Sequence, residues 1–223
     1  RLNQAGALVH VYTDGSVHLN HGGTEMGQGL FTKVAQIVAT VFQIDINHIK
    51  ISSTRTDKVP NTSATAASAG SDLNGMAAYN AANEIKTRMT KIAAEHFDVE
   101  PNSIEFRQNR VYSENKSLKF SEIAEMTWNK RVSLSATGYY RTPDLHWDSE
   151  SMKGTPFYYF TYGACISEVV IDTLTGESKV MSADILQDCG ATLNPDIDLG
   201  QIEGGFVQGL GWVTSEELVW NKE

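Results

Sequence analysis

A run of eight residues, Gly-Gly-Thr-Glu-Met-Gly-Gln-Gly at positions 22–29, separates two stretches of different periodicity. Before it, residues 7–20 alternate apolar and polar side chains around an Asp-Gly pair, which predicts a β-hairpin. After it, apolar side chains recur at helical spacing through residues 30–42. Glycine permits close approach at such a helix start, and the helix dipole favours an anion there. The run therefore predicts either a binding turn for a polar ligand or a turn that serves helix–strand packing.

The rest of the first half continues this mixture of strand and helix patterns. Residues 48–54 alternate like a strand, and the proline and small residues of 57–71 predict a loop. A long helix is expected from Ser71-Asp72, both good N-cap residues, to about His96. Its apolar stripe is expected to consist of Met76, Tyr79, Ala82, Ile85, Met89 and Ile92.

The second half predicts more strands than helices. A hairpin is expected at 104–112 with its turn at Asn109-Arg110, and a short helix at 121–127. The remaining expected elements are strands at 132–140, 159–171 and 178–187 and a helix from Asn194-Pro195 to about 214. Because this order is not a regular strand–helix alternation, it predicts the α+β class, with mixed sheets and long packed helices. We interpret the chain as one domain fragment, 1–223, or as two lobes of about 1–130 and 131–223.

Charge and composition argue against several kinds of partner. The net charge of −9 makes a nucleic acid an improbable partner. There is no run of about 18 apolar residues, so no membrane-spanning segment is expected. The start at Arg1, without a signal peptide, and the end at Glu223 both look cut, which predicts part of a longer protein. Cys165 and Cys189 lack the spacing of a zinc site or a disulfide framework and are expected to be small buried residues in neighbouring strands.

Two further segments resemble the first in having small side chains near a helix start. Residues 65–71 read Thr-Ala-Ala-Ser-Ala-Gly-Ser, which leaves the backbone accessible and adds the hydroxyls of Ser68 and Ser71. Residues 200–205 read Gly-Gln-Ile-Glu-Gly-Gly and place Gln201 early in a helix that is poor in helix formers. So many glycines in one helix predict that another backbone or a ligand packs against it. Three such helix starts would form a cage of donors around a polar, anionic cofactor.

Each segment also has an ordinary structural interpretation. Residues 65–71 have the composition of a flexible linker, and Gln201 could be a solvated glutamine on a helix surface. Glu25 is interpreted as an electrostatic or capping residue beside a helix start. The signature of a P-loop, Gly-Lys-Ser/Thr, is absent, and no Gly-x-Gly-x-x-Gly opens a helix after a strand. A nucleotide-binding fold is therefore disfavoured.

Together these motifs resemble the molybdenum-cofactor part of the xanthine dehydrogenase/oxidase family, a group of molybdenum hydroxylases. The matching stretches are the octapeptide at 22–29, Pro60-Asn61-Thr62-Ser63 with Thr65-Ala-Ala-Ser68, and Gly-Gln-Ile-Glu-Gly with Phe206-Val-Gln-Gly-Leu210. Arg131-Val-Ser-Leu-Ser-Ala-Thr-Gly138 and Asn194-Pro-Asp-Ile-Asp198 extend the resemblance. It covers nearly the whole chain in order.

The resemblance implies a molybdopterin cradle. The residues that it implies for cofactor binding are Met26, Gly27, Gln28, Ala67, Ser68, Gly70, Ser71 and Gln201. Ala66 and Ala67 would lie beside the substrate channel. No residue of this chain is implied as a direct metal ligand. None is implied as catalytic, because the family's glutamate base lies in a Gly-Glu-Pro-type segment that this chain does not contain.

The resemblance also implies an oxidoreductase that hydroxylates a purine such as hypoxanthine or xanthine. The molybdenum–molybdopterin would act with 2Fe–2S clusters and FAD carried elsewhere, in other domains or subunits of a cytoplasmic, homo-oligomeric enzyme. The fragment alone is expected to be inactive. Two alternatives remain: an aldehyde- or nicotinate-type molybdenum hydroxylase, and a non-catalytic module that binds a small molecule through the same glycine loops.

Overall fold

The computed structural model describes residues 3–58 and 62–221. Pro60 and Asn61, which belong to one of the sequence motifs, therefore lie outside the described residues. Contacts within the chain divide it into two compact units, Arg1–Tyr158 and Tyr159–Glu223. Helices and strands are mixed in both units, so the expected α+β class is confirmed.

A four-stranded sheet forms the centre of the first unit. Strands β1 (Gln4–Val11) and β2 (Val17–His21) form the expected antiparallel hairpin around the turn at Asp14 and Gly15. Strand β7 (Ser135–Arg141) pairs antiparallel with the other edge of β1, so the chain beyond residue 130 completes the same sheet. The short strand β3 (Ile49–Ile51) pairs parallel with β2, which gives the order β3-β2-β1-β7.

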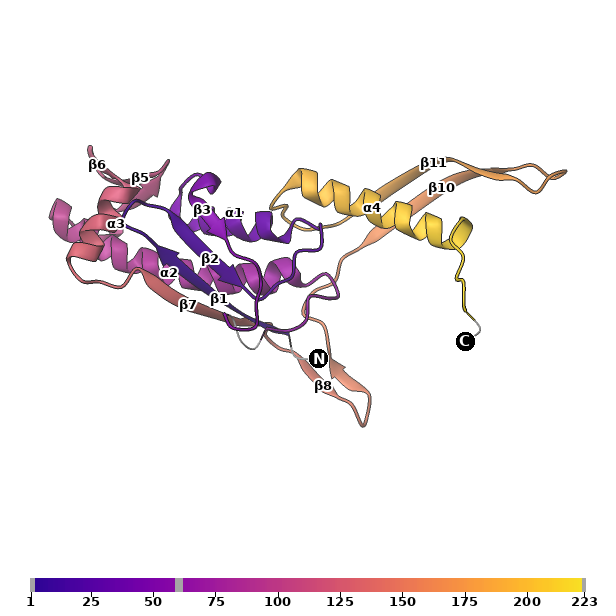
Figure 1. Cartoon of the computed structure of the whole chain (residues 1–223), viewed down its shortest axis with the longest axis horizontal. Helices are drawn as coiled ribbons and strands as arrows, with labels where there is room; N and C mark the ends of the chain where they lie inside the picture. Colours follow the sequence, from indigo (N-terminus) through magenta and orange to yellow (C-terminus); the bar gives the residue numbers. More distant parts are fainter. Residues whose placement is uncertain (1–2, 59–61, 222–223) are drawn as a thin grey trace. The chain divides into compact units, whose positions relative to one another are not determined.

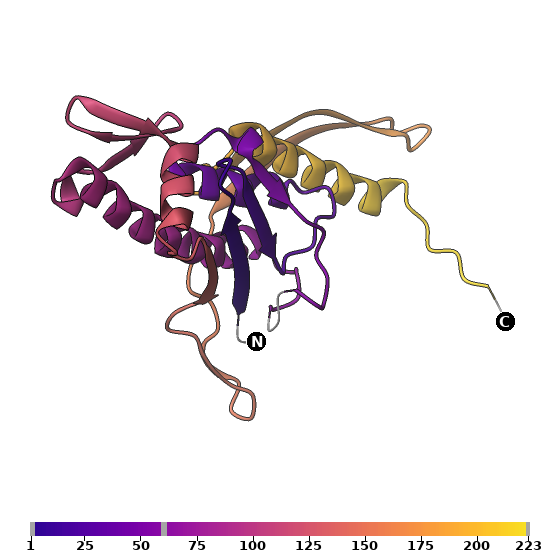
Figure 2. The same cartoon turned by 60° about the vertical axis from the view of Figure 1, so that its left-hand side comes forward.

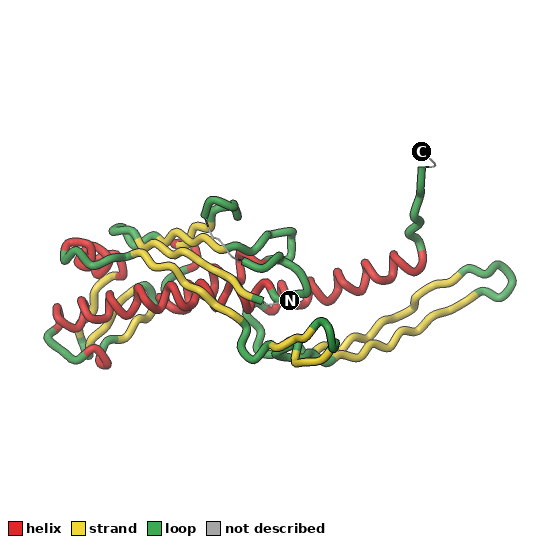
Figure 3. The backbone as a smooth tube through the Cα atoms, turned by 90° about the horizontal axis from the view of Figure 1, so that it is seen from below, coloured by secondary structure: helices red, strands yellow, loops and turns green. Residues whose placement is uncertain are grey.

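Two helices, α1 (Leu30–Phe42) and α2 (Gly70–Phe97), supply the core that covers one face of this sheet. In Figure 3 the strands of the sheet run over the long helix α2. Along β1, buried and half-buried residues alternate, and the buried ones face the helices. The expected periodicities of β1 and α1 are therefore confirmed by burial as well as by backbone conformation.

The packing of α2 corrects the apolar stripe expected from the sequence. Met76 and Tyr79 are 38% and 44% exposed, whereas Ala77, Ala78, Ala81 and Ala82 are fully buried. The cause is the close approach of α2 to β7 at Gly138, where an added Cβ would lie 2.0 Å from the carbonyl oxygen of Ala77. Only small side chains fit between a helix and a strand at that separation, so the alanines occupy the interface.

Secondary elements at the far end of α2 close the core of the first unit. Strands β4 (Glu105–Arg107), β5 (Arg110–Ser113) and β6 (Lys116–Lys119) form a small antiparallel sheet beside helix α3 (Phe120–Asn129). The turn between β4 and β5 lies at Gln108 and Asn109, one residue earlier than expected, because both residues take positive φ values of 49° and 62°.

Several short elements had no counterpart in the sequence pattern. These are β6, the 3-10 turns at Ile46–His48 and Pro101–Ser103, and the ribbon of β8 (His146–Asp148) with β9 (Lys153–Thr155). Figure 2 shows the β8–β9 ribbon projecting from the end of β7. Each is three or four residues long, too short to show a period.

The second unit consists of one hairpin and one helix. Strands β10 (Gly163–Ile171) and β11 (Ser178–Gln187) pair antiparallel, and α4 (Pro195–Thr214) follows (Figure 1). Helix α4 begins at Asn194-Pro195 as expected, and Asn194 is its N-cap, since its Oδ1 accepts from the N–H of Ile197 at 3.1 Å. Cys165 and Cys189 are both exposed, so their expected burial was wrong. Cys165 lies on β10, in which every residue is exposed, and Cys189 follows the end of β11, so neither is enclosed by a core.

Candidate functional site

The glycine run forms a self-supporting loop between β2 and α1. The carboxylate of Glu25 accepts from the N–H groups of Gly27 (2.9 Å), Gly29 (3.1 Å) and Phe31 (2.8 Å). Burial alone would raise the pKa of Glu25, but these backbone donors outweigh it and hold the pKa below its usual range. Glu25 is thus a capping residue at the start of α1, as the sequence suggested.

Gln28 closes the same loop with its side-chain amide. Its Oε1 accepts from the N–H of Met26 at 2.6 Å, and its Nε2 donates to the carbonyl of Thr24 at 2.9 Å. A primary amide has a second N–H and a second lone pair, so Gln28 can still bind a ligand. Met26 is 68% exposed, and Gly27, with φ of 103°, has nothing within 4 Å of where a Cβ would lie.

The second segment, residues 65–71, forms a tight corner at the start of α2. Helix α2 begins at Gly70, with Ala69 as its N-cap, and not at the expected Ser71-Asp72. The helix begins earlier because Ala67 and Ser68 both take left-handed conformations, with φ of 54° and 56°, and turn the chain abruptly. For residues other than glycine, two consecutive positions of this kind cost about 1–2 kcal/mol each. Ala66, Ala67 and Ser68 are all exposed on this corner.

The loop and the corner lie against each other. The N–H of Thr24 donates to Thr65 Oγ1 at 2.9 Å, across 41 positions of sequence. A Cβ on Gly22 would overlap the side chain of Thr62, and one on Gly70 would touch Leu30, the first residue of α1. Two of the three predicted segments therefore lie side by side, with the N-termini of α1 and α2 beside each other.

Buried polar side chains that the sequence analysis did not identify support this site. His21, 2% exposed, accepts at Nδ1 from the N–H of Gly23 at 3.1 Å, and Thr54 Oγ1 donates to the carbonyl of Gly23. Asn74, also 2% exposed, donates from Nδ2 to the carbonyl of Gly70 at 2.9 Å. The available signal was positional: His21 directly precedes the glycines, and Asn74 is polar on the buried face of α2.

The third predicted segment lies in the second unit. Gln201 is an exposed residue of α4, and its part in the site stays a prediction. Within the described residues, a Cβ on Gly200, Gly204, Gly205 or Gly209 would meet nothing within 4 Å. The close backbone contact that these glycines predict is therefore not made within the part of the chain that the structure describes.

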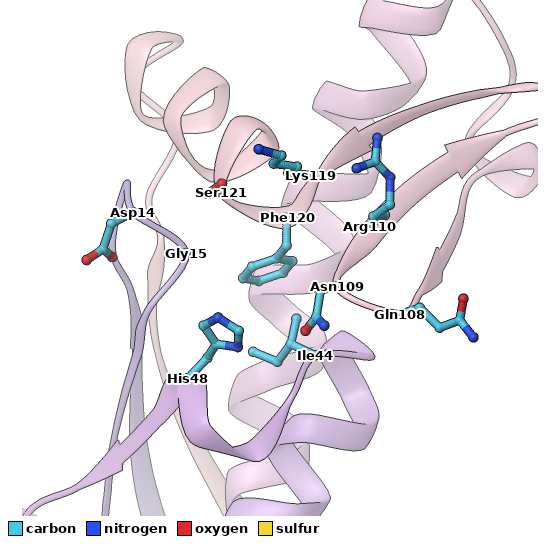
Figure 4. A pocket seen from close by; sticks show the side chains of 10 residues that line it. All are labelled: Asp14, Gly15, Ile44, His48, Gln108, Asn109, Arg110, Lys119, Phe120 and Ser121. Atoms are coloured by element: carbon cyan, nitrogen blue, oxygen red, sulfur yellow. The ribbon is translucent and has the colours of Figure 1, made fainter.

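A separate cavity of about 330 Å³ lies beside Phe120. Figure 4 shows His48, Asn109 and Lys119 among the side chains that line it, under the first turn of α3. Asp14 and Gly15 also line it, so it lies at the turn end of the β1–β2 hairpin, whereas the glycine loop follows the other end of β2. The cavity and the glycine loop are thus different places on the molecule.

Comparison with known proteins gives close relatives along the whole chain. The chain is 51% identical over 222 residues to a xanthine dehydrogenase of Oryza sativa subsp. japonica and 49% identical over 222 residues to a xanthine dehydrogenase/oxidase of Gallus gallus. Each alignment covers all of this chain but only 15% of the relative. The chain thus corresponds to a small part of those enzymes.

Solved structures match the fold. Reconstituted CO dehydrogenase from Oligotropha carboxidovorans superposes with a TM-score of 0.83 at 27% identity, over 99% of this chain and 27% of that one. Quinoline 2-oxidoreductase from Pseudomonas putida 86 gives 0.84 at 24% identity, over 98% of this chain and 28% of that one, which shows a shared fold. The family model described as the molybdopterin cofactor-binding domain matches residues 1–223. The chain belongs to this molybdopterin cofactor-binding domain family.

Proposed function

We propose that this chain supplies much of the molybdopterin cradle of a xanthine dehydrogenase-like enzyme that oxidises a purine such as hypoxanthine or xanthine. The observation that carries the proposal is the hydrogen bond from the N–H of Thr24 to Thr65 Oγ1, which joins the glycine loop to the α2 corner. That bond sets two helix N-termini side by side. The high identity to xanthine dehydrogenases supports the purine substrate.

The chemistry of the loop and the corner fits an anionic, polar cofactor. Both helix dipoles present their positive ends at this site. Glu25 accepts from the N–H of Phe31 in α1 and Asp72 from the N–H of Leu73 in α2, so these carboxylates already balance part of that positive potential. Glycine and alanine side chains leave the backbone of residues 27 and 66–67 open. The strain at Ala67 and Ser68 is of the kind found where a chain is shaped around a ligand.

The proposed roles follow the positions of the residues. Met26, Gly27 and Gln28 would hold the cofactor from the loop. The corner would hold it through Ala67, Ser68, Gly70 and Ser71, with Gln201 as a contribution from α4. Ala66 and Ala67 would border the substrate. When bound, the cofactor supplies the two-electron oxidation of the substrate carbon.

Other parts of the reaction are assigned outside these residues. The carboxylate of Glu25 already accepts three backbone N–H groups, so it is unsuited to act as a general base. We propose that the catalytic glutamate, the 2Fe–2S clusters and FAD are carried by other domains or subunits. A homo-oligomeric, cytoplasmic enzyme completes the proposal. An aldehyde- or nicotinate-type hydroxylase is less favoured, because about half of all positions are identical to xanthine dehydrogenases.

Substitution Ser68→Asp in the complete enzyme tests the proposal directly. Aspartate tolerates the left-handed conformation of this position, so the fold should be kept, while its charge would repel an anionic cofactor. We expect molybdenum per polypeptide, measured by mass spectrometry of the metal, to fall by about tenfold, the order of one unfavourable charge contact.

The control is Ser149→Asp, which places the same charge on an exposed residue of the β8–β9 turn. It should leave the molybdenum content unchanged. Equal molybdenum content in the two variants would contradict the proposed site, and an enzyme without molybdenum in the unsubstituted form would contradict the proposed function altogether. Residues 1–223 purified alone should produce no urate from xanthine, and appreciable urate would show that the catalytic base lies within them.

A further inference from the structure

The imidazole of His21 lies beneath the glycine loop and touches both of its ends. At the start of the loop, Nδ1 accepts from the N–H of Gly23 at 3.1 Å. At the end of the loop, the ring meets Phe31 edge-on, with centroids 5.0 Å apart and an interplanar angle of 86°. Phe31 is also one of the three residues whose N–H donates to the Glu25 carboxylate. The buried side chain of His21 therefore contacts Gly23, near the start of the loop, and Phe31, just after its end.

Gly23 is held in place by hydrogen bonds to its N–H and its carbonyl and by close packing against two helices. Its carbonyl accepts from Thr54 Oγ1, and its N–H is held by His21. A Cβ at this position would lie 2.6 Å from Leu30 Cδ2 and 2.7 Å from Asn74 Nδ2, so the backbone is pressed against α1 and α2 at once. Because the next residue, Thr24, makes the hydrogen bond to the corner, the position of Gly23 determines the spacing between the loop and the corner.

The hydrogen bond fixes the chemical form of the ring. An imidazole that accepts at Nδ1 must carry its proton on Nε2 and be neutral. Burial lowers the pKa of His21 to about 4, against the opposing effect of the Glu25 carboxylate. Nε2 itself is buried and has no hydrogen-bond partner among the described residues.

This arrangement separates the roles of packing and positioning. A phenylalanine would fill the same space and contact Phe31 without burying an unpartnered N–H. The acceptor for Gly23 is what the imidazole adds and a phenylalanine cannot provide. The histidine therefore holds Gly23 in one position, but its own Nε2–H has no hydrogen-bond partner among the described residues.

From this geometry we propose that His21 is a positioning residue for the cofactor, locked as the neutral Nε2–H tautomer, and that its bond to Gly23 sets the separation of the glycine loop from the α2 corner. The proposal rests on the function proposed above. It assigns to His21 no contact with the cofactor. Its effect is transmitted through Gly23 and Thr24.

The first test uses the unsubstituted chain and needs no cofactor. Nitrogen-15 spectra of the histidine rings should show His21 as the neutral Nε2–H form at pH 5.5, where exposed imidazoles are mostly protonated. The Gly23 amide should exchange slowly with solvent. A charged ring at this pH, or a proton on Nδ1, would overturn the proposal whether or not any variant folds.

The second test compares His21→Phe with His21→Asn in the complete enzyme. Asparagine places an acceptor near the position of Nδ1, whereas phenylalanine keeps only the packing. We expect His21→Phe to lose about tenfold in retained molybdenum, the order that one lost hydrogen bond changes an equilibrium, and His21→Asn to recover most of it. His10→Phe is the matched control on β1, where the histidine is half-buried, and should retain the full molybdenum content.

The two proposals fail in different ways. If the unsubstituted enzyme holds molybdenum and His21→Phe holds as much, His21 does not position the loop, but the cradle stands. If the unsubstituted enzyme holds none, the proposed function fails, while the tautomer and the Gly23 exchange rate still decide whether His21 orders the loop. A His21→Asn variant that loses as much molybdenum as His21→Phe counts against the proposed acceptor role.

Discussion

At the scale of single residues, His21 ties the stability of the chain to pH. Its folded pKa, about 4, lies below the ordinary value of 6.5, so the unfolded chain binds more protons between these values. The free energy of unfolding should therefore be fully developed above pH 6.5 and fall as the pH drops toward 4. The expected slope reaches at most about 1.4 kcal/mol per pH unit. Urea unfolding at several pH values should show a steeper fall in stability for the chain than for His21→Phe, since His18, whose pKa burial also lowers, contributes to both.

Substitution of Glu25 should lower the free energy of unfolding, because its carboxylate holds the glycine loop together. In Glu25→Gln, the glutamine has one amide oxygen, whereas the glutamate has two charged carboxylate oxygens that together accept from three backbone N–H groups. We expect a loss of about 1–2 kcal/mol, the usual cost of weakening a helix cap. The measurement is the urea midpoint. Glu150→Gln, an exposed glutamate in the β8–β9 turn, should leave it unchanged, and a similar loss in both variants would contradict the capping role.

At the scale of elements, the contact between α2 and β7 depends on one missing side chain. Gly138→Ala would place a Cβ 2.0 Å from the Ala77 carbonyl and 2.6 Å from the Ala81 nitrogen. Neither backbone atom can move without displacing the helix. We expect destabilisation by about 3 kcal/mol or more, at the upper end for overpacking.

Gly200→Ala makes the opposite prediction in α4. This helical glycine has open space where a Cβ would lie, so alanine should stabilise the helix of the 223-residue chain by about 0.5–1 kcal/mol. Helicity, followed by circular dichroism as the temperature rises, measures the change in stability of Gly138→Ala and of Gly200→Ala. Equal effects of the two alanines would show that the close contact at Gly138 is not a determinant of the fold.

How far the sequence predicted these elements depended on their length. The long periodic segments, α1, β1, β10, β11 and α4, were predicted with nearly correct bounds. In α2 the helix was correct but the face was wrong, because size-based reasoning selected Met76 and Tyr79 where a close strand admits only alanine. For the candidate site, composition singled out the glycine loop and the corner, and their contacts with a cofactor stay a prediction. His21 and Asn74 were not singled out, because their roles depend on burial that no local pattern reveals.

At the scale of the whole molecule, apolar side chains are distributed unevenly between the units. The described hydrophobic core lies in the first unit, whereas the second exposes large side chains on both strands and on α4. Examples are Ile166 and Leu186 on the hairpin and Trp212 on α4, with exposures of 74%, 77% and 76%. No helix within the described ranges is long and apolar enough to cross a membrane.

Such exposed surface predicts association when the chain is purified alone. Surfaces of this kind usually mark contacts with other protein. We expect residues 1–223 to form dimers or larger species with rising concentration in analytical ultracentrifugation. Changing Ile166 and Trp212 together to serine should shift the distribution toward monomer. A clean monomer of the unsubstituted chain at high concentration would contradict this expectation.

The bond between Thr24 and Thr65 has a consequence for the order of assembly. It links segments 41 positions apart, and these segments precede α1 and α2, whose buried residues share the core beside the sheet. We therefore expect the contact between the two helix starts to form late in folding, since closing a loop between distant segments costs chain entropy. A cofactor held by the loop and the corner would then be inserted into a largely folded scaffold and would not serve as the nucleus around which the polypeptide collapses.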